Sequence, residues 1–234
     1  MPLAERLETP RRRTRGARRR RRGELSREQI VDAALAFIDR HGVDELSMRR
    51  LAAELGAGTM TIYGYFRDKD ELLDAVVDAI SARAPLPELR GSWREQLRQL
   101  ALLFSVNLSE HPGLVRLRLE RPILTPGALR ITEEGMRILE DAGFDPREAA
   151  RAFRTVFVYT FGSAAFNPPG RVADAQRAVR MAAAALPAED YPRLVGAVEE
   201  MVEVMDPGAQ FERGLDLILD GLERRLEEMR TRRS

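Results

Sequence analysis

Cysteine is absent from this chain of 234 residues, and histidine occurs only twice. The lack of cysteine excludes disulfide bonds, thiolate metal sites and cysteine nucleophiles together. A catalytic base or a metal site would have to be built from carboxylates, and no pair of them has a spacing that suggests one. We therefore expect that the protein is not an enzyme and that it uses no metal and no cofactor.

Long apolar runs are also missing from the sequence. None approaches the roughly 20 residues that a membrane-spanning helix needs, and the N-terminus lacks the apolar segment of a secretory signal. Hydrophobic residues still make up 44% of the chain, which is ample for a buried core. We expect a soluble, cytoplasmic protein with no membrane partner.

Lysine occurs once, as Lys69, and arginine supplies the other basic residues. Ten arginines lie within residues 1–23 against Glu5 and Glu8, so this arm has a net charge of +8 and leaves −7 of the total of +1 for residues 24–234. We expect the arm to be disordered, and the asymmetry favours a polyanionic partner such as nucleic acid. Two alternatives stay open. In the first, the arm is a solvated tail typical of an arginine-rich proteome. In the second, the assigned start codon lies upstream of the true N-terminus, and the arm is an artefact of that assignment.

The chain after the arm shows one helical signal after another. Serine and glutamine in 26-SREQ-29 stand at capping-box spacing before a first amphipathic helix that ends at Gly42. Ser47 can cap a second helix, and the turn 56-GAG-58 leads into a third helix of about two turns. A connecting helix follows and ends near Arg83.

Helical periodicity continues to the C-terminus, and no segment alternates in the way a strand does. We therefore expect an all-α protein in which a three-helix helix-turn-helix unit is joined by the connecting helix to a larger helical bundle. The helices predicted for the bundle are residues 93–108, 126–142, 146–166, 172–186, 191–205 and 211–229.

The segment 59-TMTIYGYFRDK-69 carries more polar and aromatic groups than a core helix needs. Ile62 and Phe66, four residues apart, are expected to face inward, which leaves the threonines and tyrosines outside. Threonine can contact base edges, tyrosine and lysine can contact phosphates, and arginine can bind guanine. The pattern favours DNA binding over the alternative of an exposed polar helix in a bundle.

Residues 46-LSMRRLAAELGAGTMTIYGYFRDKDELL-73 resemble the N-terminal signature of the tetracycline-repressor (TetR) family of transcription regulators, and the resemblance extends from residue 26 to about 83. It implies a homodimer that places two recognition helices in successive major grooves, about 34–36 Å apart, on a nearly palindromic DNA operator. The DNA-binding residues that it implies are Arg49, Thr59, Met60, Thr61, Tyr63, Tyr65 and Lys69.

The C-terminal part is similar to the tetracycline repressors in 92-SWREQLRQLALLF-104 and 211-FERGLDLILDGLERRL-226. The resemblance places Leu117 at the position of their metal-binding histidine, so we expect no magnesium-tetracycline site. An apolar or aromatic small-molecule effector is expected instead. The effector-binding residues expected are Leu100, Phe104, Asn107, Leu117, Phe157 and Phe161, with Tyr159 and Glu120 as further polar contacts. The same Phe and Leu spacing is also typical of an ordinary helical core.

Two apolar helices with small residues, 153–166 and 211–226, are expected to form the dimer interface. Gly214 and Gly221 each cost a helix interior about 1 kcal/mol relative to alanine, and close approach by another helix would compensate. Paired across a twofold axis, the two helices would make a four-helix interface. The open alternative is that they are ordinary core helices.

The residues and the resemblance together predict a ligand-responsive repressor that an effector releases from a double-stranded DNA operator. The domains expected are the disordered arm 1–23, a helix-turn-helix DNA-binding domain 24–70, and an effector-binding and dimerisation domain 71–234. The alternative left open is a nonspecific nucleic-acid-binding dimer driven by the arm.

The arm generates the first testable prediction. From Glu24 to Arg83, seven cations stand against twelve carboxylates, so the charge that favours DNA lies in a few residues and in the arm. Deletion of residues 1–22 should weaken DNA binding and flatten its salt dependence, because fewer phosphates release counterions. The measurement is the slope of log affinity against log salt concentration for the full and the truncated chain. Equal slopes would show that the arm is idle.

Overall fold

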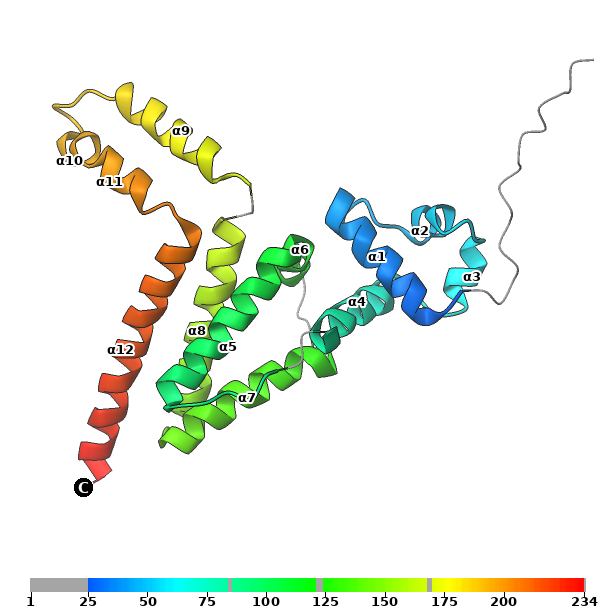
Figure 1. Cartoon of the computed structure of the whole chain (residues 1–234), viewed down its shortest axis with the longest axis horizontal. Coiled ribbons are helices and arrows are strands. Elements are labelled where there is room, and N and C mark those ends of the chain that lie inside the picture. Colours follow the sequence, from blue (N-terminus) through cyan, green and yellow to red (C-terminus); the bar gives the residue numbers. More distant parts are fainter. Residues whose placement is uncertain (1–24, 84–85, 121–123, 168–169, 234) are drawn as a thin grey trace, which may run out of the picture.

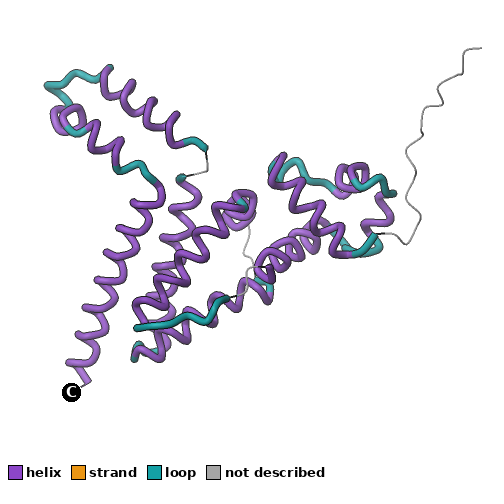
Figure 2. Tube along the Cα trace, in the orientation of Figure 1, coloured by secondary structure: helices purple, strands orange, loops and turns teal. Residues whose placement is uncertain are grey.

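The structure, a computed structural model, describes residues 25–83, 86–120, 124–167 and 170–233, which form helices and loops without any strand (Figures 1 and 2). The all-α prediction is confirmed, and the arm 1–23 lies outside the described residues. None of the helices in these ranges is both long and apolar enough to cross a membrane. The helices are α1 (Arg27–His41), α2 (Met48–Glu54), α3 (Thr59–Tyr63), α4 (Lys69–Arg83), α5 (Trp93–Glu110), α6 (Pro112–Glu120), α7 (Pro126–Ala142), α8 (Pro146–Phe166), α9 (Val172–Ala184), α10 (Pro192–Gly196), α11 (Val198–Glu203) and α12 (Pro207–Arg233).

The N-terminal helices begin where their caps predict. The Ser26 hydroxyl accepts a hydrogen bond from the Gln29 amide at 3.1 Å, and the Ser26 amide donates to the Gln29 side chain at 2.9 Å, which completes a capping box. Ser47 caps α2 through the Arg50 amide at 3.2 Å. α3 has five residues and is shorter than the predicted two turns, because Gly64 stands at its C-cap and glycine favours helix poorly.

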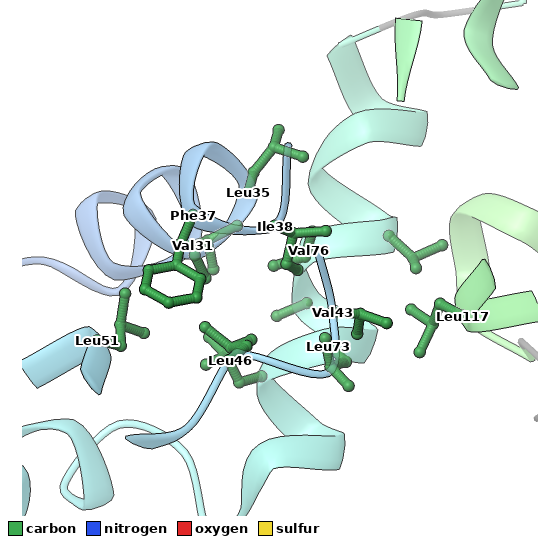
Figure 3. Close-up of a cluster of buried hydrophobic side chains, with 14 of the residues drawn as sticks. Val31, Leu35, Phe37, Ile38, Val43, Leu46, Leu51, Leu73, Val76 and Leu117 are labelled. Atoms are coloured by element: carbon green, nitrogen blue, oxygen red, sulfur yellow. The ribbon is translucent and has the colours of Figure 1, made fainter. Parts of the chain in front are cut away.

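The first hydrophobic core joins α1, α2, α3 and α4 and extends to α6 (Figure 3). Its most deeply buried side chains are Ile30, Ala34, Leu51, Ile62, Phe66, Leu72 and Val76. α6 contributes Val115 and Leu117 to this core, and a Cβ at Gly113 would lie 2.3 Å from the Ile38 side chain of α1. The N-terminal helical unit therefore packs directly on the bundle.

The second core lies within the bundle, where α8 packs against α5, α7 and α12. Its fully buried side chains include Leu97, Ile138, Leu139, Leu215 and Leu219. Ion pairs also connect α5 to α12, with Arg94 bound to Asp220 at 2.5 Å and Arg98 bound to Glu212 at 2.7 Å. Each such partly exposed pair stabilises the fold by no more than about 1 kcal/mol, so apolar burial holds the bundle together.

The structure differs from the prediction for the bundle in one helix that was missed and in two whose extent was wrong. α6 was not predicted, because its buried residues Val115 and Leu117 are two positions apart and do not follow a helical period. The single helix expected over 191–205 is interrupted at Ala197, whose φ of −118° and ψ of 18° separate α10 from α11. α12 begins at Pro207 and not at 211, because the Asp206 carboxylate accepts a hydrogen bond from the Ala209 amide at 2.8 Å and caps it.

A contact inside the bundle generates the second prediction. A Cβ at Gly214 of α12 would lie 1.9 Å from the Tyr159 hydroxyl oxygen of α8. Gly214→Ala should therefore lower the free energy of unfolding by about 1–3 kcal/mol, because the ring must leave its packed position. In a Tyr159→Ala background, Gly214→Ala should not lower the free energy of unfolding, as measured by urea unfolding. Equal losses in both backgrounds would contradict the contact.

Candidate nucleic-acid interface and ligand cavity

α2, a tight turn and α3 form the helix-turn-helix. Gly56 adopts a φ of 64°, a conformation that other residues rarely adopt, and the Ala57 amide donates to the Ala52 carbonyl oxygen at 2.9 Å. Ile62 and Phe66 are 0% and 1% exposed and face the core. The opposite side of α3 is thereby turned to solvent.

That outer side of α3 carries the residues expected to contact DNA. Met60 and Tyr63 are 76% and 45% exposed, while Thr59 and Thr61 are half-buried. The Tyr63 hydroxyl forms no hydrogen bond with any described residue. It is therefore available to donate to a phosphate oxygen.

The arginines beside α3 differ in whether a carboxylate already holds them. Arg50 pairs with Glu45, and Arg67 pairs with Glu71 at 3.1 Å. The Arg67 backbone amide, and then its guanidinium, hydrogen-bond to Glu71 and hold the pKa of that carboxyl below its ordinary value. Glu71 thus stays charged and offsets Arg67. Arg49 is exposed on α2 and forms no ion pair within the described part of the chain, which leaves its guanidinium for a ligand.

Tyr65 and Lys69 are tied into the domain by hydrogen bonds of their own. The Tyr65 hydroxyl donates to the Leu25 carbonyl oxygen, and the Lys69 ammonium donates to the Val43 carbonyl oxygen at 2.9 Å. The single hydroxyl hydrogen of Tyr65 is therefore used, whereas the ammonium keeps two hydrogens for a phosphate. Sequence reasoning missed both bonds, because the accepting carbonyls are distant in the chain and belong to any residue type.

A cavity of about 390 Å³ lies between α4, α5 and α7. Its apolar wall includes Leu86, Leu100, Leu103, Phe104 and Ile131. Its polar side chains are Ser81, Asn107 and Arg130. A cavity of this size, mostly apolar with a few polar groups, is typical of small-molecule sites.

A smaller cavity of about 110 Å³ continues the first toward α8. The two cavities share four lining residues: Ser81, Phe104, Asn107 and Ile131. Three phenylalanines form a row along this second wall. The ring centroids of Phe104 and Phe157 are 5.2 Å apart with planes at 22°, and those of Phe157 and Phe161 are 6.2 Å apart with planes at 15°.

The structure brings most of the expected effector residues together. Those that line one or both cavities are Leu100, Phe104, Asn107, Phe157 and Phe161. Leu117 does not line either one, because it is 2% exposed within the first core, where Figure 3 shows it on the side of Val43 and Leu73. Tyr159 also points elsewhere, since its hydroxyl donates to the Gln210 and Phe211 carbonyl oxygens at 3.1 Å each. The Glu120 side chain lies outside the described ones.

Sequence reasoning missed the contributions of α4 and α7 to the cavity. Ser81 of α4, together with Arg130 and Ile131 of α7, completes the wall. The Asp78 carboxylate accepts a hydrogen bond from the Gly127 amide at 2.8 Å, and a Cβ at Gly127 would lie 2.5 Å from the Ser81 Cβ. The glycine after Pro126 was the only sequence signal for this close approach of the two helices.

Metal binding finds no support among the described residues. No group of three or more histidine, aspartate and glutamate side chains there is placed to hold an ion. The groups that line the cavities suit an organic ligand held by apolar contact and a few hydrogen bonds.

Known families match both parts of the chain. The family described as bacterial regulatory proteins, tetR family, matches residues 30–76. The family described as tetracyclin repressor-like, C-terminal domain, matches residues 84–226, which is more than half of the chain.

Individual proteins agree with these matches. An HTH-type transcriptional regulator of Saccharopolyspora erythraea is 32% identical over 85% of this chain and 84% of its own length. The HTH-type transcriptional repressor DrrR1 of Streptomyces coeruleorubidus is 34% identical over 60% of this chain, which spans about half, 53%, of that relative. The solved structure of the TetR family protein ActR of Streptomyces coelicolor in complex with actinorhodin has a TM-score of 0.75 and 30% identity, over 86% of this chain and 98% of that one. The chain therefore belongs to the tetracycline-repressor (TetR) family and is a DNA-binding transcriptional regulator.

Proposed function

We propose that the protein is a homodimeric repressor that binds a nearly palindromic operator and leaves it when a small apolar or aromatic effector fills the cavity. The position of α4 carries this proposal. Leu72 and Val76 of α4 are buried in the core under α3, and Ser81 and Ala82 of the same helix line the cavity. One continuous helix thus connects the candidate DNA-binding surface to the candidate effector site.

The relatives support repression and ligand control. The protein from Streptomyces coeruleorubidus is named a repressor, and the ActR structure contains actinorhodin. By analogy we assign residues 24–70 to DNA binding and 71–234 to effector binding and dimerisation, with α4 packed against both parts.

The DNA contacts follow from the outer side of α3 and its neighbours. The residues assigned to base edges are Arg49, Thr59, Met60 and Thr61, and those assigned to the DNA backbone are Tyr63, Tyr65 and Lys69. Within the second set, Tyr63 has an unused hydroxyl, whereas the hydrogen bonds of Tyr65 and Lys69 hold the start of α1 and the loop before α2. Tyr65 accordingly acts first as a positioning residue.

The switch acts through the junction of α4 and α7. An effector between α4, α5 and α7 presses on the contact between Asp78 and Gly127, which holds α4 in its present place. A ligand shifts an equilibrium only by its differential affinity for the two states. To change operator occupancy from nearly full to nearly empty, the binding free energies of the effector for the two states must differ by about 5.5 kcal/mol.

The dimer interface is assigned to the outer faces of α8 and α12. Val158 and Leu217 on these helices are 49% and 60% exposed, although each is a large apolar residue. Cβ atoms at Gly162 and Gly221 would meet no described atom within 4 Å. An apolar, small-residue face that is open in the single chain suits close packing against a second copy.

The DNA-binding assignment predicts a difference between two tyrosines. Selection from a random DNA pool should enrich a near palindrome, and Tyr63→Phe should weaken binding to it by about fivefold or more, because each protomer loses a phosphate contact. Tyr65→Phe removes the same atom as a matched control. It should lower the free energy of unfolding by about 1 kcal/mol and change operator affinity little. Fluorescence anisotropy and urea unfolding measure the two effects.

Tight binding without an enriched sequence would contradict the repressor assignment and support the nonspecific, arm-driven alternative. That alternative also predicts that affinity follows salt concentration alone, with no loss in Tyr63→Phe.

The dimer assignment predicts that a charge on α12 separates the protomers. Leu217→Arg should weaken association at least about 100-fold, because the interface would bury an unpaired cation. Sedimentation velocity should then show a species of the single-chain mass, 26.4 kDa, in place of one of twice that mass. Val106→Arg on α5, at a site 55% exposed and remote from both faces in sequence, is the control and should leave the dimer intact. A dimer that survives Leu217→Arg would place the interface elsewhere.

A further inference from the structure

One charged side chain, Arg130, is among the described residues that border the cavity between α4, α5 and α7. None of these described lining residues is a carboxylate. Arg130 lies in the first half of α7 and forms neither an ion pair nor a hydrogen bond with any described residue. A guanidinium has five N–H donors and no acceptor, so these donors are available to a ligand.

Two other arginines on the helices that line the cavity, one on α5 and one on α7, are paired with carboxylates. Arg98 pairs with Glu212 at 2.7 Å, and Arg137, two turns after Arg130 on α7, pairs with Glu134 at 2.6 Å. These pairs leave no charge to attract an anion to their surroundings. Arg130 is exposed at the edge of the cavity and differs from Arg98 and Arg137 in having no ion-pair partner among the described residues.

Two polar side chains on the same wall complement an acidic ligand. The Asn107 amide forms no hydrogen bond with a described residue, so it offers both a donor and an acceptor. The Ser81 hydroxyl donates to the Val77 carbonyl oxygen at 3.0 Å and keeps its lone pairs for a donor on the ligand. Together with Arg130 they suit a carboxylate and a hydroxyl or carbonyl on one molecule.

The cleft on the other side of Arg130 has the opposite character. Between α1, α4 and α7 it is lined by three carboxylates, Glu28, Asp32 and Asp78, against Arg27 and Arg130. This acidic cleft repels an anion, whereas none of the described residues that line the cavity is a carboxylate. The charges therefore direct the acidic group of a ligand to the cavity side of Arg130.

The remaining wall favours flat rings. Phe104 lines both cavities and is stacked with Phe157, and the row continues to Phe161. Aromatic rings pack on one another in offset or edge-on contacts that add to simple burial. We propose that the effector is a polycyclic aromatic acid whose anionic group binds Arg130 and whose rings lie along Phe104 and Phe157. This inference rests on the proposed effector role of the cavity.

Three related probes test the proposal: anthracenecarboxylate, its neutral carboxamide and the corresponding aminomethylanthracene, which is a cation at neutral pH. The full chain without DNA is titrated with each probe, and binding is followed by probe fluorescence. The carboxylate should bind about tenfold more tightly than the carboxamide, the advantage of a hydrogen-bonded ion pair. Arg130→Gln should abolish that ratio, and Arg130→Lys should keep part of it, because lysine retains the charge without the fork of donors.

Two controls separate this effect from general charge and from binding elsewhere. Arg147→Gln removes one exposed cation at the start of α8, which does not line the cavities, and should keep the ratio. Leu100→Ala changes the apolar wall and should weaken carboxylate and carboxamide alike. Equal binding of these two probes by the unmodified chain, tighter binding of the cation, or a ratio that survives Arg130→Gln would overturn the proposal. Failure of the carboxylate to bind would overturn it as well.

Operator release, measured separately with the selected DNA, distinguishes this inference from the proposed function. If carboxylate and carboxamide bind equally and both release the operator, the ligand-responsive repressor stands and the role of Arg130 fails. If the carboxylate binds in an Arg130-dependent way and operator affinity stays constant, Arg130 is an anion site and the switch fails.

Discussion

The burial of α4 between two parts of the molecule is the constraint on which the rest of the structure depends. Leu72 and Val76 are fully buried in the core shared with α1, α2 and α3, and burial of such side chains stabilises a fold by about 1.5–3 kcal/mol each. The C-terminal part of the same helix is fixed to α7 by the hydrogen bond between Asp78 and Gly127. Both ends of α4 are thus held by tertiary contacts, one in the core of the helix-turn-helix unit and one at α7, and we propose that this helix carries the response to an effector.

The two functional surfaces use charge in different ways. Around α3 most arginines are paired with carboxylates, and Arg49 is the exception among the described residues nearby. We propose that sequence-specific contact there depends on a few side chains placed by the Gly56 turn, and we expect the attraction to DNA as a polyanion to depend on the arm. At the cavity, Arg130 is the charged side chain among the described lining residues, and we propose that its charge selects among otherwise similar aromatic molecules.

Sequence reasoning found the helices whose signals are local. The capping box of α1 and the prolines at the starts of α7 and α8 are each recognised within four residues, so these helices begin where predicted. α6 was not predicted because it packs against three helices, α8, α5 and α1, so its buried side chains do not follow a single helical face. Five of the expected effector residues, on α5 and α8, line one or both cavities. Leu117 does not, because it is buried in the first core.

By itself the sequence determined the all-helical class, the helix-turn-helix with its outward residues and the family, because each rests on spacing or on a motif within a short segment. Only the tertiary structure decided which polar groups are free: Tyr63 and Arg130 are, whereas Tyr65, Lys69 and Arg67 are engaged. It also decided that α4 and α7 meet at Gly127 to close the cavity. Partners distant in the chain make these contacts, and no local pattern of residues encodes them.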